Sequence, residues 1–165
     1  STDQAPTQGD NPLRWEDAWS EHMTVGNAKG IYNDILEYFA GRQDKLFVVI
    51  TAPPLSSAET EGGRAANARA FNNWLVNDWL RDYPHRNVAV FDFYNVLTHP
   101  DNHHWVQDNE VRHIVANGQN TSAYASDEWD SHPNPEGDLK ASSEFVPLLN
   151  VYYHCWKGSG DCPPR

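Results

Sequence analysis

Two hydrophobic periodicities alternate along this chain. From Thr24 to Phe39 the apolar residues recur at three- and four-residue intervals, which predicts a helix that buries one face. Thr24 is a suitable N-cap for this helix, and Gly41 is suited to end it. Residues 45–51 (KLFVVIT) then form a continuous apolar run rich in β-branched side chains. Such a run is typical of a strand that is covered on both faces, as in a parallel sheet.

The same order of helix and strand follows once more. The sequence Ala-Pro-Pro ends the first strand, and the apolar spacing of residues 64–83 predicts a second helix that Pro84 ends. Residues 87–94 (NVAVFDFY) predict a second buried strand. Helices that alternate with buried strands indicate the α/β class with parallel strands.

A long polar segment and a final helix complete the pattern. Residues 98–126 are rich in His and Asn, with a short amphipathic piece at 111–115, and we expect a long loop here that is either functional or poorly ordered. Asn134 is suited to be the N-cap of a last helix that starts at Pro135 and runs to about residue 156. Pro147 is expected to kink or interrupt that helix.

The length of 165 residues predicts one domain. We expect an extended polar loop over residues 1–21, the domain over residues 22–156, and a flexible tail over residues 157–165. Two strands are too few for a stable parallel sheet with helices on both faces. The order of elements is therefore that of the C-terminal half of a doubly wound domain, and Ser1 is interpreted as a processed or cut end.

The composition of the chain argues against some classes of binding partner. Acidic side chains outnumber basic ones by 23 to 12, which gives a net charge of −11. This charge argues against nucleic acid and anionic membranes as partners. No apolar run approaches the roughly 18–20 residues of a membrane-spanning helix, and no signal peptide is recognisable. Seven tryptophans, seven tyrosines and six phenylalanines supply apolar area for a core.

The two cysteines lie close together near the C-terminus. Cys155 and Cys162 are separated by a segment that contains Gly158 and Gly160, which makes it flexible enough to close a disulfide. A disulfide implies an oxidising compartment, and we therefore expect a secreted protein. The alternative is a pair of free thiols in a frayed tail.

The most informative chemistry is the sequence Asp130-Ser131-His132-Pro133. In an extended segment, residues two apart point the same way, so Asp130 is placed to orient the imidazole of His132. A carboxylate beside a histidine is the base-and-orienter half of a nucleophilic triad. Ser131 points the opposite way and is not the expected nucleophile. The alternative is a surface histidine and a solvated acid in a turn.

Three features together resemble the C-terminal part of the SGNH (GDSL-type) hydrolases. They are the strand 45–51 followed by Ala-Pro-Pro, the strand 87–94, and Asp130–Pro133 at the start of a final helix. The resemblance covers roughly residues 22–156. It implies a three-layer α/β/α fold with a mostly parallel, flavodoxin-like sheet, and it implies serine esterase activity with His132 as the base.

The family also specifies where the other triad members belong. Its aspartate usually lies three residues before the histidine, where this chain has Trp129; Asp130 is one residue closer, and Asp127 is the fallback orienter. The family's nucleophile lies in a Gly-Asp-Ser block, but residues 9–12 are Gly-Asp-Asn-Pro. Residues 30–34 (GIYND) superficially match the family's Gly-x-Asn-Asp block, yet they fall within a helix with one residue too many.

The nucleophile is therefore expected outside this chain. Ser56 and Ser57 follow a strand, but neither has the glycine-flanked turn that a nucleophile requires. The resemblance implies that an N-terminal segment or a separate chain supplies the first strands, with the serine and the oxyanion-stabilising glycine and asparagine. That partner would complete the sheet.

A histidine-rich cluster raises the question of a metal. His99, His103, His104 and His113, together with Asp101 and Asp108, are suitable ligand types. None of them forms a regular helical pair, so a solvated loop is the favoured interpretation. We predict neither a metal nor an organic cofactor.

Two functions follow from these patterns. The first is the C-terminal portion of a secreted serine esterase that acts on acyl or acetyl esters. Carbohydrate esters are one option, because Trp105 and Trp129 flank polar loops and an indole can stack on a sugar ring. The alternative is a non-catalytic, secreted module that binds carbohydrate or another partner through exposed aromatic side chains.

Overall fold

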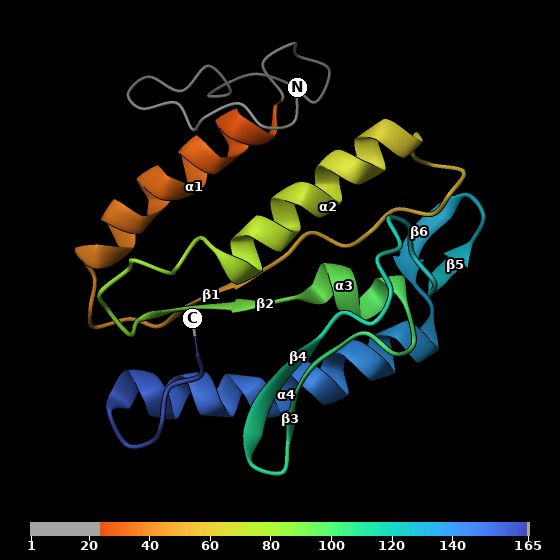
Figure 1. Ribbon diagram of the computed structural model, residues 1–165. Coiled ribbons are helices and arrows are strands. Elements are labelled where there is room, and N and C mark those ends of the chain that lie inside the picture. Colours follow the sequence, from red (N-terminus) through yellow and green to blue (C-terminus); the bar gives the residue numbers. More distant parts are fainter. Residues whose placement is uncertain (1–23, 165) are drawn as a thin grey trace.

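The computed structural model describes residues 24–164. It is an α/β structure in which α1 and α2 lie on one side of the parallel strands β1 and β2, and α4 lies on the other (Figure 1). The elements in chain order are α1 (Val25–Ala40), β1 (Phe47–Ile50), α2 (Gly62–Asn77), β2 (Val88–Phe91), α3 (Phe93–Thr98), β3 (His103–Gln107), β4 (Glu110–Ile114), β5 (Ala125–Asp127), β6 (Asp130–Pro133) and α4 (Pro135–Lys157). The predicted α/β class is confirmed at this level. The polar loop predicted for residues 1–21 and the Gly-Asp-Asn-Pro sequence lie outside the described residues.

The parallel pair β1–β2 organises the structure. The Phe47 amide donates to the Asn87 carbonyl at 2.8 Å, and the Thr51 amide donates to the Phe91 carbonyl at 3.0 Å. Because backbone groups in a strand alternate in direction, the amides and carbonyls of Val48 and Ile50 face away from β2. Within residues 24–164 no further strand pairs with this edge of β1.

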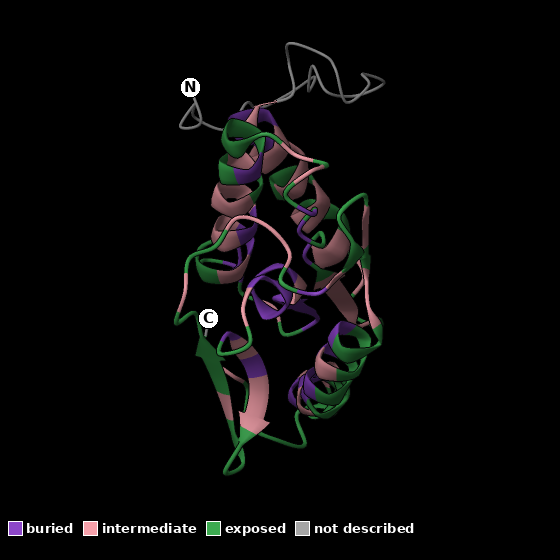
Figure 2. Ribbon diagram, turned by 90° about the vertical axis from the view of Figure 1, so that its right-hand side faces the viewer, coloured by how far each residue is buried: buried purple, intermediate pink, exposed green. Residues whose placement is uncertain are grey.

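The two faces of this pair build two hydrophobic clusters. Ala89 and Phe91 pack with Leu148 and Tyr152 of α4 on one face. On the other face, the α1 and α2 side, Val88 and Val90 pack with a second set of apolar side chains (Leu75, Trp79, Leu80, Tyr83). The alternation of side chains along a strand assigns neighbouring residues to opposite clusters. The short helix α3, buried over Tyr94–Thr98, lies at the centre between the layers (Figure 2).

Several element boundaries differ from the sequence prediction. The second helix ends at Asn77 rather than at residue 83, because the amides of both Asp78 and Trp79 bond to the Trp74 carbonyl and turn the chain. The second strand ends at Phe91. Asp92 then caps α3 by accepting the amide of Asn95, so residues that look strand-like by composition are helical.

The predicted loop over residues 98–126 contains the β3–β4 hairpin and the start of the β5–β6 hairpin. Asp108 and Asn109, with φ of 53° and 64°, form the two-residue turn between β3 and β4. This left-handed pair is the conformation that short hairpins require. Pro147 does not interrupt α4, which continues to Lys157 and ends at Gly158 in the left-handed conformation, with φ of 69°.

The predicted disulfide between Cys155 and Cys162 is confirmed, and it ties the C-terminal tail to the end of α4. None of the helices within residues 24–164 combines the length and the apolar character that a membrane crossing requires.

A glycine in α4 allows the helix to approach the segment before it. A Cβ atom on Gly137 would lie 2.7 Å from the Cβ of buried Tyr124 and 3.3 Å from that of Pro133. We expect Gly137→Ala to lower the free energy of unfolding by roughly 1–3 kcal/mol, because the added methyl overpacks this contact. Gly63→Ala in α2 is the matched control, since nothing lies within 4 Å of its added methyl. Urea unfolding followed by tryptophan fluorescence measures both, and equal stability of the two variants would contradict the close approach.

Candidate active site

Strand β6 brings Asp130 and His132 together. The Asp130 Oδ1 atom lies 2.6 Å from His132 Nδ1, and the same oxygen accepts the backbone amide of His132 at 3.0 Å. The alternation of side chains along the strand places both on one side. The structure therefore shows the contact that the sequence predicts, whereas the catalytic role of the two residues stays a prediction.

The electrostatics of the pair suit a general base. The hydrogen bond from Asp130, together with its negative charge, raises the pKa of His132. The backbone amide of His132, followed by its side chain, lowers the pKa of Asp130. With Nδ1 bound to a carboxylate, the neutral imidazole carries its lone pair on Nε2. The His132 side chain is 91% exposed, so this lone pair faces solvent.

The segment that follows β1 holds the β5–β6 hairpin in place. The Ser56 amide donates to Ser131 Oγ at 2.8 Å, and the Ser56 hydroxyl donates to the Glu128 carbonyl at 2.7 Å. The Ser131 amide donates to Glu59 Oε2 at 2.9 Å, and its hydroxyl bonds to the same carboxylate. These bonds connect Asp130 and His132 to the segment at the carboxyl end of β1, where sites of open parallel sheets lie.

The serines of this region are already engaged in structural hydrogen bonds. Ser131 lies between Asp130 and His132, but its hydroxyl bonds to Glu59, on the side opposite the imidazole. Ser56 is buried, and its hydroxyl bonds to the hairpin backbone. Neither hydroxyl bonds to His132, which a serine activated by that histidine requires.

Of the other residues singled out from the sequence, Asp127 and Trp129 lie on the same hairpin as Asp130, whereas Trp105 lies on the β3–β4 hairpin. Trp129 is 70% exposed and directly precedes Asp130. Asp127 accepts the Trp129 amide at 2.7 Å, so its carboxylate is engaged at the hairpin turn rather than with His132. Trp105 lies on β3, where its ring stacks on His103 at a centroid distance of 3.7 Å.

The four clustered histidines have separate partners. His99 bonds to the Asp101 amide, His103 to Glu144, His104 to the Asp92 amide, and His113 to the Asp92 carboxylate. Across residues 24–164, no group of three or more His, Cys, Asp or Glu side chains is arranged to hold a metal ion.

A second acid–histidine pair escaped the sequence analysis. Asp92 is fully buried, and its Oδ2 lies 2.6 Å from His113 Nε2 and accepts Asn95 Nδ2 at 2.7 Å. The sequence signal was an acid at the carboxyl end of a buried strand. The contact between Asp92 and His113 was missed because residues 98–126 were predicted to be a loop. The β3–β4 hairpin brings His113 back to β2.

Comparisons of the chain with protein-family models, with curated proteins and with solved structures found no match.

The assignment of Asp130 rather than Asp127 as the orienting acid is testable. Asp130→Asn removes the charge that raises the pKa of His132, so we expect that pKa to fall toward its ordinary value of about 6.5. Asp127→Asn is the matched control, and it should leave the His132 titration unchanged. Titration of the imidazole resonances by NMR, with His132→Gln to assign the signal, measures both. An equal fall in the two variants would contradict the assignment.

Proposed function

We propose that this chain is the C-terminal part of an SGNH-like serine esterase and that it supplies the histidine and the aspartate of the triad. The contact between Asp130 and His132 carries the proposal, because it leaves His132 Nε2 exposed on a hairpin that is held by the segment following a parallel strand. The complete enzyme would have the three-layer, flavodoxin-like fold of that family. The resemblance of the sequence motifs supports this proposal.

The proposed chemistry divides the triad between two parts of the enzyme. A serine hydroxyl from an N-terminal segment attacks the ester carbonyl while His132 Nε2 accepts its proton. The imidazolium then returns the proton to the departing alcohol, and Asp130 holds the imidazole in the productive tautomer throughout. Backbone and asparagine donors in the same N-terminal segment would stabilise the oxyanion.

The open edge of β1 supports the idea of a missing segment. A parallel strand in an α/β sheet is ordinarily paired on both sides and covered on both faces. Among the described residues β1 is paired only with β2, and Ile50 at its end is half exposed. An additional strand would satisfy the free amides and carbonyls of Val48 and Ile50.

The outer face of α4 supports the same idea. Four large apolar residues are exposed along this helix at spacings of seven, three and four positions, which places them on one face. They are Leu139, Val146, Leu149 and Tyr153. An exposed apolar stripe is typical of a surface that another element covers. A helix of the N-terminal segment would cover it.

Two further observations bear on the substrate and the compartment. The exposed indole of Trp129 adjoins the Asp130–His132 pair, which suits stacking on a sugar ring and therefore a carbohydrate ester. The disulfide is compatible with secretion.

The first experiment asks whether the chain acts alone. We expect the isolated chain to show no hydrolysis of 4-nitrophenyl acetate and no labelling by a serine-reactive fluorophosphonate. Turnover by the isolated chain that is lost in His132→Ala would overturn the proposal that the nucleophile lies elsewhere.

The second experiment uses the protein as it occurs in its source. Intact-mass measurement of native material should reveal an additional segment or chain, and the fluorophosphonate should label that part. His132→Ala should lower ester hydrolysis by the complete protein by at least about a thousandfold. Ser57→Ala is the control and should retain activity. If no labelled part accompanies the chain and sugar binding survives His132→Ala, the alternative of a non-catalytic binding module is supported instead.

A further inference from the structure

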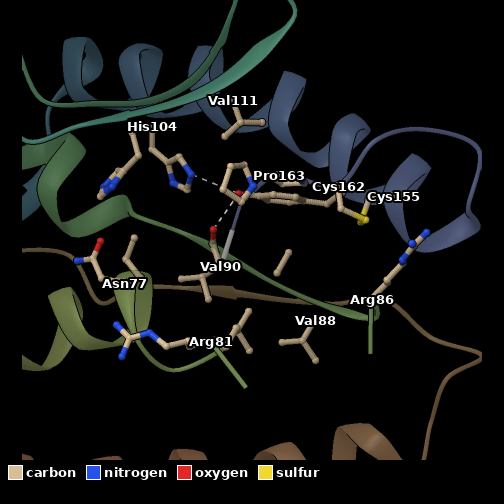
Figure 3. A pocket seen from close by; sticks show the side chains of 16 residues that line it. Asn77, Arg81, Arg86, Val88, Val90, His104, Val111, Cys155, Cys162 and Pro163 are labelled. Atoms are coloured by element: carbon tan, nitrogen blue, oxygen red, sulfur yellow. Dashed lines mark hydrogen bonds between the residues drawn. A yellow bond between two sulfur atoms is a disulfide. The ribbon is translucent and has the colours of Figure 1, made fainter. Parts of the chain in front are cut away.

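A cavity of about 380 Å³ lies beside β2, among the residues that the structure describes. Its walls are β2, the end of α2 with the segment that follows it, the β3–β4 hairpin, the end of α4, and the tail from Cys162 onward (Figure 3). No β1 residue lines it, so a strand added to the open edge of β1 leaves this cavity accessible. The volume lies within the range of small-molecule sites.

The floor and roof of the cavity are apolar. Val88 and Val90 of β2 lie on one side, Val111 of β4 lies opposite, and Pro163 lies between them (Figure 3). The prolines of the tail have no amide hydrogens, so the tail covers this edge of β2 without pairing with it as a strand. Such walls suit the apolar body of an organic molecule rather than a peptide strand.

The charged groups of the cavity have one sign. Arg81 and Arg86 line it, and none of its described lining residues is an Asp or Glu. This is a local reversal in a chain with a net charge of −11. Arg81 is already paired with Asp78, whereas Arg86 has no acidic partner within residues 24–164. Arg86 is therefore the group that can bind an anion.

Two uncharged polar side chains, His104 and Tyr152, lie at the end of the cavity away from Arg86. His104 Nδ1 accepts the Asp92 amide at 3.0 Å, so the ring hydrogen lies on Nε2. Burial lowers the pKa of His104 to about 4, which keeps this ring neutral near pH 7. Nε2 faces the Tyr152 hydroxyl at 3.5 Å, and that hydroxyl donates to the Val90 carbonyl at 2.8 Å.

His113 completes that end. Its Nε2 is engaged by the buried carboxylate of Asp92, and no hydrogen bond involves its Nδ1 in the described part of the chain. The ring packs edge-on against His104, with centroids 5.0 Å apart. The cavity thus has a fixed polar end, apolar sides and a cationic end at Arg86.

We propose that this cavity binds a small organic carboxylate with an elongated apolar body. The carboxylate binds Arg86, and the apolar body lies between Val90 and Val111 and extends toward His104. This inference does not rest on the proposed esterase function, because neither Asp130 nor His132 lines the cavity.

The test compares ligands of equal length and different charge. Octanoate, octanol and octyltrimethylammonium are titrated into the full chain at pH 7 by calorimetry, and amide shifts locate the bound ligand. We expect octanoate to bind more tightly than either analogue and to shift the amides of residues 88–90 and 160–162. Equal binding of octanol and octanoate, or shifts confined to the outer face of α4, would overturn the proposal.

Two variants and one control separate the charge from the shape of the site. Arg86→Ala should weaken octanoate binding about fivefold, as expected for an exposed ion pair, and should leave octanol unchanged. Arg64→Ala removes the same charge from the first turn of α2, outside the cavity lining, and should have no effect. Val111→Trp fills the cavity and should abolish binding while the circular dichroism spectrum stays native. Equal affinities in Arg86→Ala and Arg64→Ala would show that only the net charge acts, which contradicts the proposed contact.

Discussion

The parallel hydrogen bonds between β1 and β2 are the constraint on which the remaining structure depends. They fix the register Phe47 with Val88 through Ile50 with Phe91. Because this register is set, alternate side chains of both strands enter the cluster under α4 or the cluster under α1 and α2. The same register places two polar segments at the carboxyl ends of the strands. One begins at Thr51 and holds the β5–β6 hairpin, and the other begins at Asp92 and holds the β3–β4 hairpin.

Local patterns predicted the central elements well. The helical spacing after Thr24 and the β-branched run at 45–51 gave α1 and β1, because burial imposes one period on a helix and another on a strand. The N-cap Asn134 gave the start of α4, since its side chain accepts the Gly137 amide at 2.9 Å. In these cases neighbours in sequence are also neighbours in space, so the sequence contains the relevant interaction.

The missed features depend on residues that are distant in sequence. The β3–β4 hairpin begins and ends among polar residues, and its identity rests on Asp108 and Asn109 adopting positive φ. The buried Asp92 gains a distant partner because His113, 21 residues later, returns to it. Similarly, Asp130 and His132 were identified from their spacing, but the bonds from Ser56 and Glu59 that position their hairpin span about 70 residues. No local pattern reports such contacts.

The open edge of β1 also affects how copies of this chain behave toward one another. Among residues 24–164 this edge is unpaired, and an unpaired strand edge is a template for association between identical chains. The net charge of −11 opposes that association, because each copy repels the next at distances of about a Debye length. At low ionic strength this repulsion keeps the edges apart. Added salt screens it and leaves the hydrogen-bonding groups of Val48 and Ile50 free to meet their counterparts. The colloidal stability of the chain therefore depends on its surface charge as much as on its fold.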